Sequence, residues 1–133
     1  MRLNISPDKK KAQSLIEMAK ITLQRLKETD EEKYPSNTLT DYYDSIHKIM
    51  EALAFLAGVR IKGEGSHQEL IDYICKKYRL EESTRVFIQE MRDYRNRISY
   101  EGFMVNSNYI KNNKGGIESI TTRLMEIFNS KNQ

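Results

Sequence analysis

Apolar residues recur every three or four positions along most of the chain, and the two prolines and six glycines fall between these periodic stretches. This spacing is typical of amphipathic helices, each of which needs a partner to cover its apolar face. The pattern therefore predicts an all-α fold, an antiparallel four- or five-helix up-and-down bundle. A chain of 133 residues is long enough for one such domain, which we expect to span residues 1–133.

The first two helices have recognisable ends. We expect the first from about residue 8 to residue 29, with Ser6 as the N-cap and Pro7 in the first turn. A break at residues 30–37 separates it from a second helix, whose apolar series starts at Tyr42. This second helix should begin to end at Gly58.

The remaining helices follow glycine-containing connections. Gly63 and Gly65 form a loop, after which the Ser-x-x-Glu pattern at residues 66–69 predicts a capping box and a third, shorter helix. The fourth should fray around Gly102. The Gly115–Gly116 pair either starts the last helix or kinks one that began near residue 106, and we favour the kink. The apolar positions of the fourth helix are Val86, Phe87, Met91, Tyr94 and Ile98.

Charge and cysteine content limit the function classes. The net charge is only +3, from 22 basic and 19 acidic residues, so binding of nucleic acid would need a local basic patch. Cys75 is the single cysteine, which excludes an internal disulfide and a Cys-x-x-Cys motif, and we expect it in the core. These features, with no apolar stretch that could act as a signal peptide, predict a cytoplasmic protein. The longest apolar run, residues 52–59, is far shorter than the about 20 residues of a membrane span, so no membrane partner is expected.

Motifs for cofactors and metals are not found in the sequence. Neither glycine pair has the spacing or the following Lys-Ser/Thr of a phosphate-binding loop. The two histidines, His47 and His67, are not part of a His-Glu-x-x-His helix, and His67 falls at a helix entrance. We therefore expect no cofactor and no metal site.

His47 has acidic neighbours on the same face of the predicted second helix. Asp44 lies three residues before it and Glu51 four residues after it. Such carboxylates favour the charged imidazole. Two interpretations stay open, a boundary histidine in a solvated acidic network or a site residue.

The segment at residues 92–102 is the most informative in the chain. Four polar residues at i, i+3, i+4 and i+7 form a stripe beside the apolar edge of the helix, and they are Arg92, Arg95, Asn96 and Ser99. On the same helix Asp93 can pair with Arg97, and Asn96 can meet Tyr100. The planar arginine fork suits phosphate, and Asn and Tyr can hydrogen-bond a base or ribose. The alternative is a charged outer face held by pairs one turn apart.

Three pieces of the sequence together resemble the HEPN domain family (higher eukaryotes and prokaryotes nucleotide-binding), in its archaeal and bacterial stand-alone form. They are Tyr43, His47 and Glu51 in Tyr-Asp-Ser-Ile-His-Lys-Ile-Met-Glu-Ala-Leu, the Gly-Ser-His-Gln-Glu-Leu junction at residues 65–70, and the Arg-Asn pair at residues 95–96. The resemblance covers roughly residues 8–130. It implies a helical homodimer, and many members are metal-independent endoribonucleases or partners of minimal nucleotidyltransferases in toxin-antitoxin-like pairs.

The family signature is an Arg, four to six residues, then a His. Here Arg95 and Asn96 match the opening, and Tyr100 stands at the histidine position. A phenol with a pKa of about 10 is a poor base at neutral pH, so the substitution affects catalysis more than binding. Residues five apart on a helix point about 140° away from each other, and the resemblance implies a cleft shared by the fourth helices of two subunits.

Three functions follow as hypotheses. The first is a HEPN-like module that binds a nucleotide or an RNA phosphate at a homodimer cleft, beside a nucleotidyltransferase partner. The second is a metal-independent endoribonuclease that uses Arg95, Asn96 and Tyr100 as its tentative catalytic groups. The third is a protein-interaction dimer without catalysis. The binding residues expected are Arg92, Arg95, Asn96, Arg97, Ser99 and Tyr100, with His47 and Glu51 as accessory residues.

Overall fold

The computed structural model describes residues 1–132, and within them it contains five helices and one small sheet, which confirms the all-α helical bundle. The helices are α1 (Lys9–Lys27), α2 (Pro35–Leu56), α3 (Ser66–Lys77), α4 (Glu82–Glu101) and α5 (Ser107–Lys131). The strands are β1 (Arg2–Asn4) and β2 (Val59–Ile61). None of the described helices is both long enough and apolar enough to cross a bilayer.

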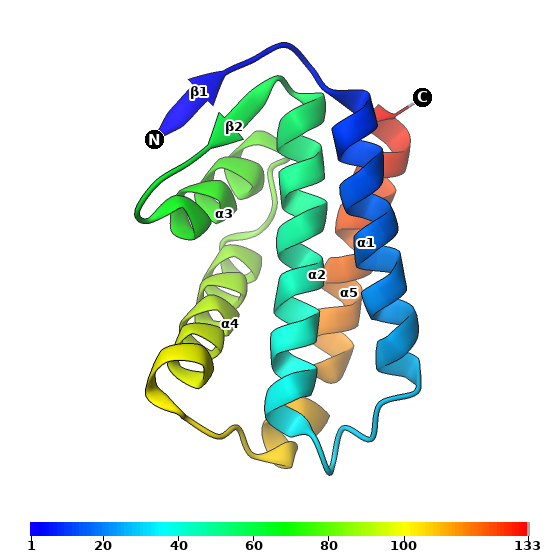
Figure 1. Ribbon diagram of the computed structural model, residues 1–133, viewed down its shortest axis with the longest axis vertical. Helices are drawn as coiled ribbons and strands as arrows, with labels where there is room; N and C mark the ends of the chain where they lie inside the picture. The colour runs from blue at the N-terminus through cyan, green and yellow to red at the C-terminus, as the bar shows by residue number, and fades with distance from the viewer. Residues whose placement is uncertain (133) are drawn as a thin grey trace.

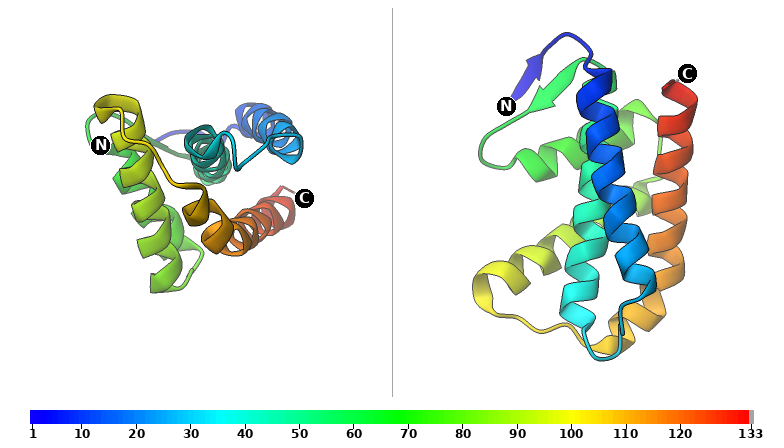
Figure 2. Two further views of the ribbon diagram at one scale, coloured as in Figure 1. Left: turned by 90° about the horizontal axis from the view of Figure 1, so that it is seen from below. Right: turned by 45° about the vertical axis from the view of Figure 1, so that its right-hand side comes forward.

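Helix α2 is the centre of the bundle, because it packs against α1, α3, α4, α5 and β2. Figure 1 shows α1, α2 and α5 as three long rods, and the end-on view in Figure 2 places α4 on the opposite side of α2 from α1 and α5. The sequence explains this position, since α2 has apolar residues around most of its circumference. Its fully buried side chains include Tyr43, Ile46, Met50 and Leu53.

The predicted N-cap of the first helix is wrong. Asp8, and not Ser6, is the N-cap of α1, and its Oδ1 accepts a hydrogen bond from the backbone N–H of Lys11 at 2.9 Å. An ionised carboxylate also interacts favourably with the positive end of the helix dipole. Pro35 belongs to α2 rather than to the break, because it occupies the first turn, where its missing N–H costs no hydrogen bond.

The predicted capping box at the start of α3 is also wrong. Gly65, with φ of 75°, is the N-cap, Ser66 is already helical, and no side chain caps this end. The carboxylate of Glu69 binds the N-terminal ammonium of Met1 instead, at 2.9 Å. Antiparallel pairing of β1 with β2 brings the two groups together, with Leu3 opposite Arg60.

The two strands were not predicted, because three residues carry too little alternation to identify a strand. Gly58 makes the connection from α2 to β2 with φ of 73°, a left-handed conformation that glycine adopts without strain. Its carbonyl accepts a hydrogen bond from Ile5 N–H at 2.9 Å. A methyl group at this position would lie 2.7 Å from the Ile5 carbonyl oxygen.

The end of α4 and the start of α5 lie where the sequence predicts them. Gly102 follows α4 in the left-handed conformation, and Asn106 caps α5, which runs without interruption through Gly115–Gly116. The glycine pair therefore lies inside a helix that begins near residue 106. One position of the predicted apolar stripe differs, since Val86 is 53% exposed whereas Met91 is fully buried.

Candidate functional site

Four side chains from α2 and α3 form what we call the histidine cluster, comprising Tyr43, His47, Glu51 and His67. The rings of His47 and His67 stack with centroids 3.8 Å apart and an angle of 16° between their planes. The Tyr43 hydroxyl lies 2.9 Å from His67 Nδ1, and Glu51 Oε1 lies 3.2 Å from His47 Nδ1. Spacings of four residues place the three α2 side chains on one face of that helix.

The environment of the cluster fixes the charges of its members. Burial, the positive charge of His47 and that of Arg95 lower the pKa of His67 to about 4, so its ring is neutral at pH 7. Burial alone would raise the pKa of Glu51, but the hydrogen bond and charge of His47 hold that pKa below its ordinary value. Burial raises the pKa of the Tyr43 phenol well above its usual range, so it keeps its proton.

Arg95 of α4 lies next to this cluster. Its Nε is 3.4 Å from Oδ1 of Asp44, which precedes His47 by one turn of α2. Nε is buried and, among residues 1–132, is the one buried side-chain nitrogen or oxygen with no hydrogen-bond partner. The Nη1 group donates a long hydrogen bond, 3.5 Å, to Asn96 Oδ1. Arg95 is thus held by one ion pair and is short of acceptors for its donors.

Arg92 lies one turn earlier on the same side of α4. Its Nε donates to Gln89 Oε1 at 3.0 Å, and its Nη2 donates to Asp93 Oδ1 at 2.8 Å. The expected pairing of Asp93 with Arg97 is therefore replaced by pairing with Arg92. The charges of both Arg92 and Arg95 lower the pKa of His67, which places the two guanidinium groups within electrostatic reach of the histidine cluster.

The other predicted residues of α4 lie apart from the cluster. The guanidinium carbon of Arg97 sits 4.0 Å from the centroid of the Phe103 ring. Tyr100 is 79% exposed, and Ser99 lines a separate hollow near Gly102. The predicted stripe is therefore divided between different surroundings. Arg95 pairs with Asp44 of α2 and donates to Asn96. The charge of Arg92 lowers the pKa of His67, whereas Arg97 and Tyr100 have other surroundings, and Ser99 faces the hollow between α4 and the start of α2.

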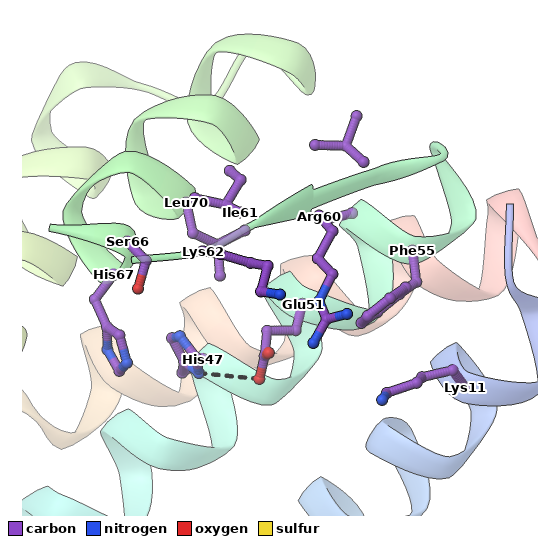
Figure 3. Close-up of a pocket in the computed structure, with 12 residues that line it drawn as sticks. Lys11, His47, Glu51, Phe55, Arg60, Ile61, Lys62, Ser66, His67 and Leu70 are labelled. Carbon is purple, nitrogen blue, oxygen red and sulfur yellow. Dashed lines mark ion pairs between the residues drawn. The ribbon is translucent and has the colours of Figure 1, made fainter. Parts of the chain in front are cut away.

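A pocket of about 220 Å³ lies beside the histidines, between α1, α2, β2 and α3, and no residue of α4 lines it. His47, Glu51 and His67 form part of its wall, and three basic side chains complete it (Figure 3). Those three, Lys11, Arg60 and Lys62, were not singled out from the sequence. They come from three separated segments, and only the fold brings them together.

The sequence did not predict that His67 and Tyr43 belong to one cluster with His47. His67 was interpreted as a helix-junction residue, although it is the ring against which His47 stacks. Tyr43 belongs to the predicted apolar series of the second helix, and only the family resemblance connected it with the site. The same resemblance quoted the junction at residues 65–70, which contains His67, and is the one signal in the sequence that links the two residues. Cys75 is buried as predicted, and burial raises the pKa of its thiol to about 11, so it is not a nucleophile at neutral pH.

Ligands for a metal ion do not gather at this site. Within residues 1–132 there is no group of three His, Cys, Asp or Glu side chains placed to hold a metal. The hydrogen-bond donors of the site are imidazole, guanidinium and phenol groups, which suit a negatively charged ligand, and the carboxylates of Asp44 and Glu51 are each paired with one of these donor groups. Comparisons of the chain with protein-family models, with curated proteins and with solved structures found no match.

Proposed function

We propose that this protein is a HEPN-like module that binds a nucleotide or an RNA phosphate where α4 packs against α2 and α3. The observation that carries the proposal is the placement of Arg92 and Arg95, whose side chains are only 20% and 25% exposed, beside the histidine cluster. Guanidinium groups that are held in place lose less conformational freedom when they bind a phosphate.

Hydrogen-bonding capacity supports the proposal more than net charge does. Asp44 and Asp93 balance the two arginines, so this surface has no large excess of positive charge. However, a guanidinium has five N–H donors, and Arg95 donates one hydrogen bond among the described residues. The oxygen atoms of a bound phosphate would accept charge-assisted hydrogen bonds from the unused N–H groups of this guanidinium.

Binding of a short single-stranded RNA, followed by fluorescence anisotropy at several salt concentrations, tests the proposal. Two phosphate contacts predict that log Kd rises with log salt with a slope of about 1.4. Arg95→Ala should weaken binding about tenfold and lower this slope by about 0.7, because one contact is lost. Arg123→Ala removes one exposed charge from α5 and is the matched control. Equal effects of the two variants, or no binding at low salt, would contradict the proposal.

The homodimer and the nucleotidyltransferase partner belong to the same proposal and are supported only by the family resemblance. Sedimentation of the protein at micromolar concentration tests the dimer. A monomer would remove the shared cleft while leaving the site on each copy in place, so the two parts of the proposal can fail separately.

RNA cleavage is a second candidate, because the structure offers a better base than Tyr100. His47 binds Glu51 through Nδ1, so a carboxylate orients an imidazole whose other nitrogen, Nε2, can exchange a proton with a ligand. Cleavage of RNA that persists in a chelator, is lost in His47→Ala and Arg95→Ala, and survives in Tyr100→Phe would establish this activity. RNA that stays intact after long incubation at high protein concentration would exclude it.

A further inference from the structure

The pocket beside His47 and His67 is also lined by basic residues from three parts of the chain. Lys11 comes from α1, Arg60 from β2, and Lys62 from the loop after β2. Figure 3 shows Arg60 and Lys62 entering from the strand side, with Lys11 at the opposite end. None of the residues that line the pocket belongs to α4.

These three cations lack acidic partners. Among residues 1–132 none of them forms an ion pair, and Lys11 Nζ lies instead 5.5 Å from the centroid of the Phe55 ring. Glu51 is the one acidic residue in the lining, and its carboxylate is already bound by His47. Three positive charges thus converge on one hollow that contains a single negative charge. Concave surfaces with charges of one sign concentrate counter-ions.

The two imidazoles give this pocket additional donors. With Nδ1 of His47 bound to Glu51 and Nδ1 of His67 bound to Tyr43, the Nε2 atoms are the nitrogens left for a ligand. A bound anion favours protonation of a nearby imidazole, because opposite charges stabilise each other. Binding should therefore be visible in the histidine resonances.

We propose that this pocket binds a phosphomonoester group in its dianionic form, at a site separate from Arg92 and Arg95. A dianion with three terminal oxygens matches one planar guanidinium fork and two ammonium groups, whereas a carboxylate offers one charge and two oxygens. A volume of about 220 Å³ is below the about 300–1,000 Å³ of pockets that enclose drug-sized ligands, so it suits a phosphate and its first attached carbons, with the rest of a larger ligand lying outside the pocket.

The test is a titration of the protein with inorganic phosphate at constant ionic strength, followed by NMR of the histidine rings. The resonances of His47 and His67 should shift and saturate. Arg60→Gln and Lys62→Gln should each weaken phosphate binding at least about tenfold, because each removes a charged hydrogen bond. Both residues are exposed, so these variants should fold, and Lys76→Gln, an exposed position of α3 outside the pocket, is the matched control.

The outcomes separate this proposal from the proposed function. Arg95→Gln should leave phosphate binding in the pocket within about twofold of the unaltered protein, even where it abolishes RNA binding. Two further probes identify the source of the phosphomonoester group. Binding of ribose 5-phosphate would indicate a small metabolite, and tighter binding of RNA with a 5′-phosphate than of the same RNA with a 5′-hydroxyl would indicate an RNA end. Histidine resonances that do not shift in phosphate, or equal weakening in Arg60→Gln and Lys76→Gln, would overturn the proposal.

Discussion

Lowering the pH from about 7.5 to about 5 should destabilise the folded protein through His67. The pKa of this ring is lowered from its ordinary 6.5 to about 4, by burial and by the charges of His47 and Arg95. In the unfolded chain the imidazole takes up a proton below pH 6.5, whereas in the folded protein it stays neutral until about pH 4. The unfolded state therefore binds more protons in this window, and stability falls as the pH falls.

The size of the effect follows from these two pKa values. The difference between the two pKa values corresponds to about 3 kcal/mol in all, of which about 2 kcal/mol is lost between pH 7.5 and pH 5. His67 is only half-buried, so solvent screens part of the interaction, and we expect a loss of about 1 kcal/mol from this residue. The remainder of the difference should appear as the pH approaches 4.

Urea unfolding at a series of pH values measures this loss in the unaltered protein and in His67→Gln. The variant should be less sensitive to acid by about 1 kcal/mol between pH 7.5 and pH 5. NMR should show the His67 ring titrating near pH 4 in the folded protein. An acid sensitivity that is the same in both proteins, or a His67 ring that titrates near pH 6.5, would refute the reasoning.

Three further predictions concern the fold. Gly58→Ala should lower the free energy of unfolding by about 2 kcal/mol or more, because it combines a left-handed backbone with a methyl group 2.7 Å from a carbonyl oxygen. Gly63→Ala, also at positive φ but with open space around it, should lower that free energy by about 1 kcal/mol in the same urea assay. Met91→Ala should lower the free energy of unfolding by about 2–5 kcal/mol, because it leaves a cavity in the core. The exposed Val86→Ala should lower it by less than about 0.5 kcal/mol, and thermal or urea unfolding measures both changes. Cys75 should react with a thiol reagent at neutral pH only as fast as the protein unfolds, because the thiol is buried and its pKa is raised to about 11. Rapid reaction of the native protein would contradict this prediction.

Helical periodicity and the positions of glycine and proline were enough to predict the bundle. They failed at helix starts, where several residues compete for one role. Ser6 and Asp8 are both good N-caps, and the choice depends on where the chain leaves β1, which local sequence does not specify. Glu69 matched a capping box, but a charged group 68 residues away in the chain became its partner.

The candidate site was only partly predictable for a similar reason. Spacing correctly placed Glu51 beside His47, because both lie on one helix and one turn apart. Which residues of α4 face α2 depends on the packing of two helices, and so Arg95 and Arg97 could not be told apart from the sequence. The stacking of His47 on His67 joins α2 to a different helix after a loop and a strand, which no local pattern encodes.

The stack of two imidazoles has a mechanical consequence for α3. His67 lies at the first turn of that helix, and its ring contributes to holding α3 on α2. If α3 lifts away, the ring enters water and gains affinity for protons, and a protonated ring resists returning to its place beside His47. Detachment of α3 and uptake of a proton thus reinforce each other, so α3 should be the first part of the molecule to open in acid while the three long rods stay together.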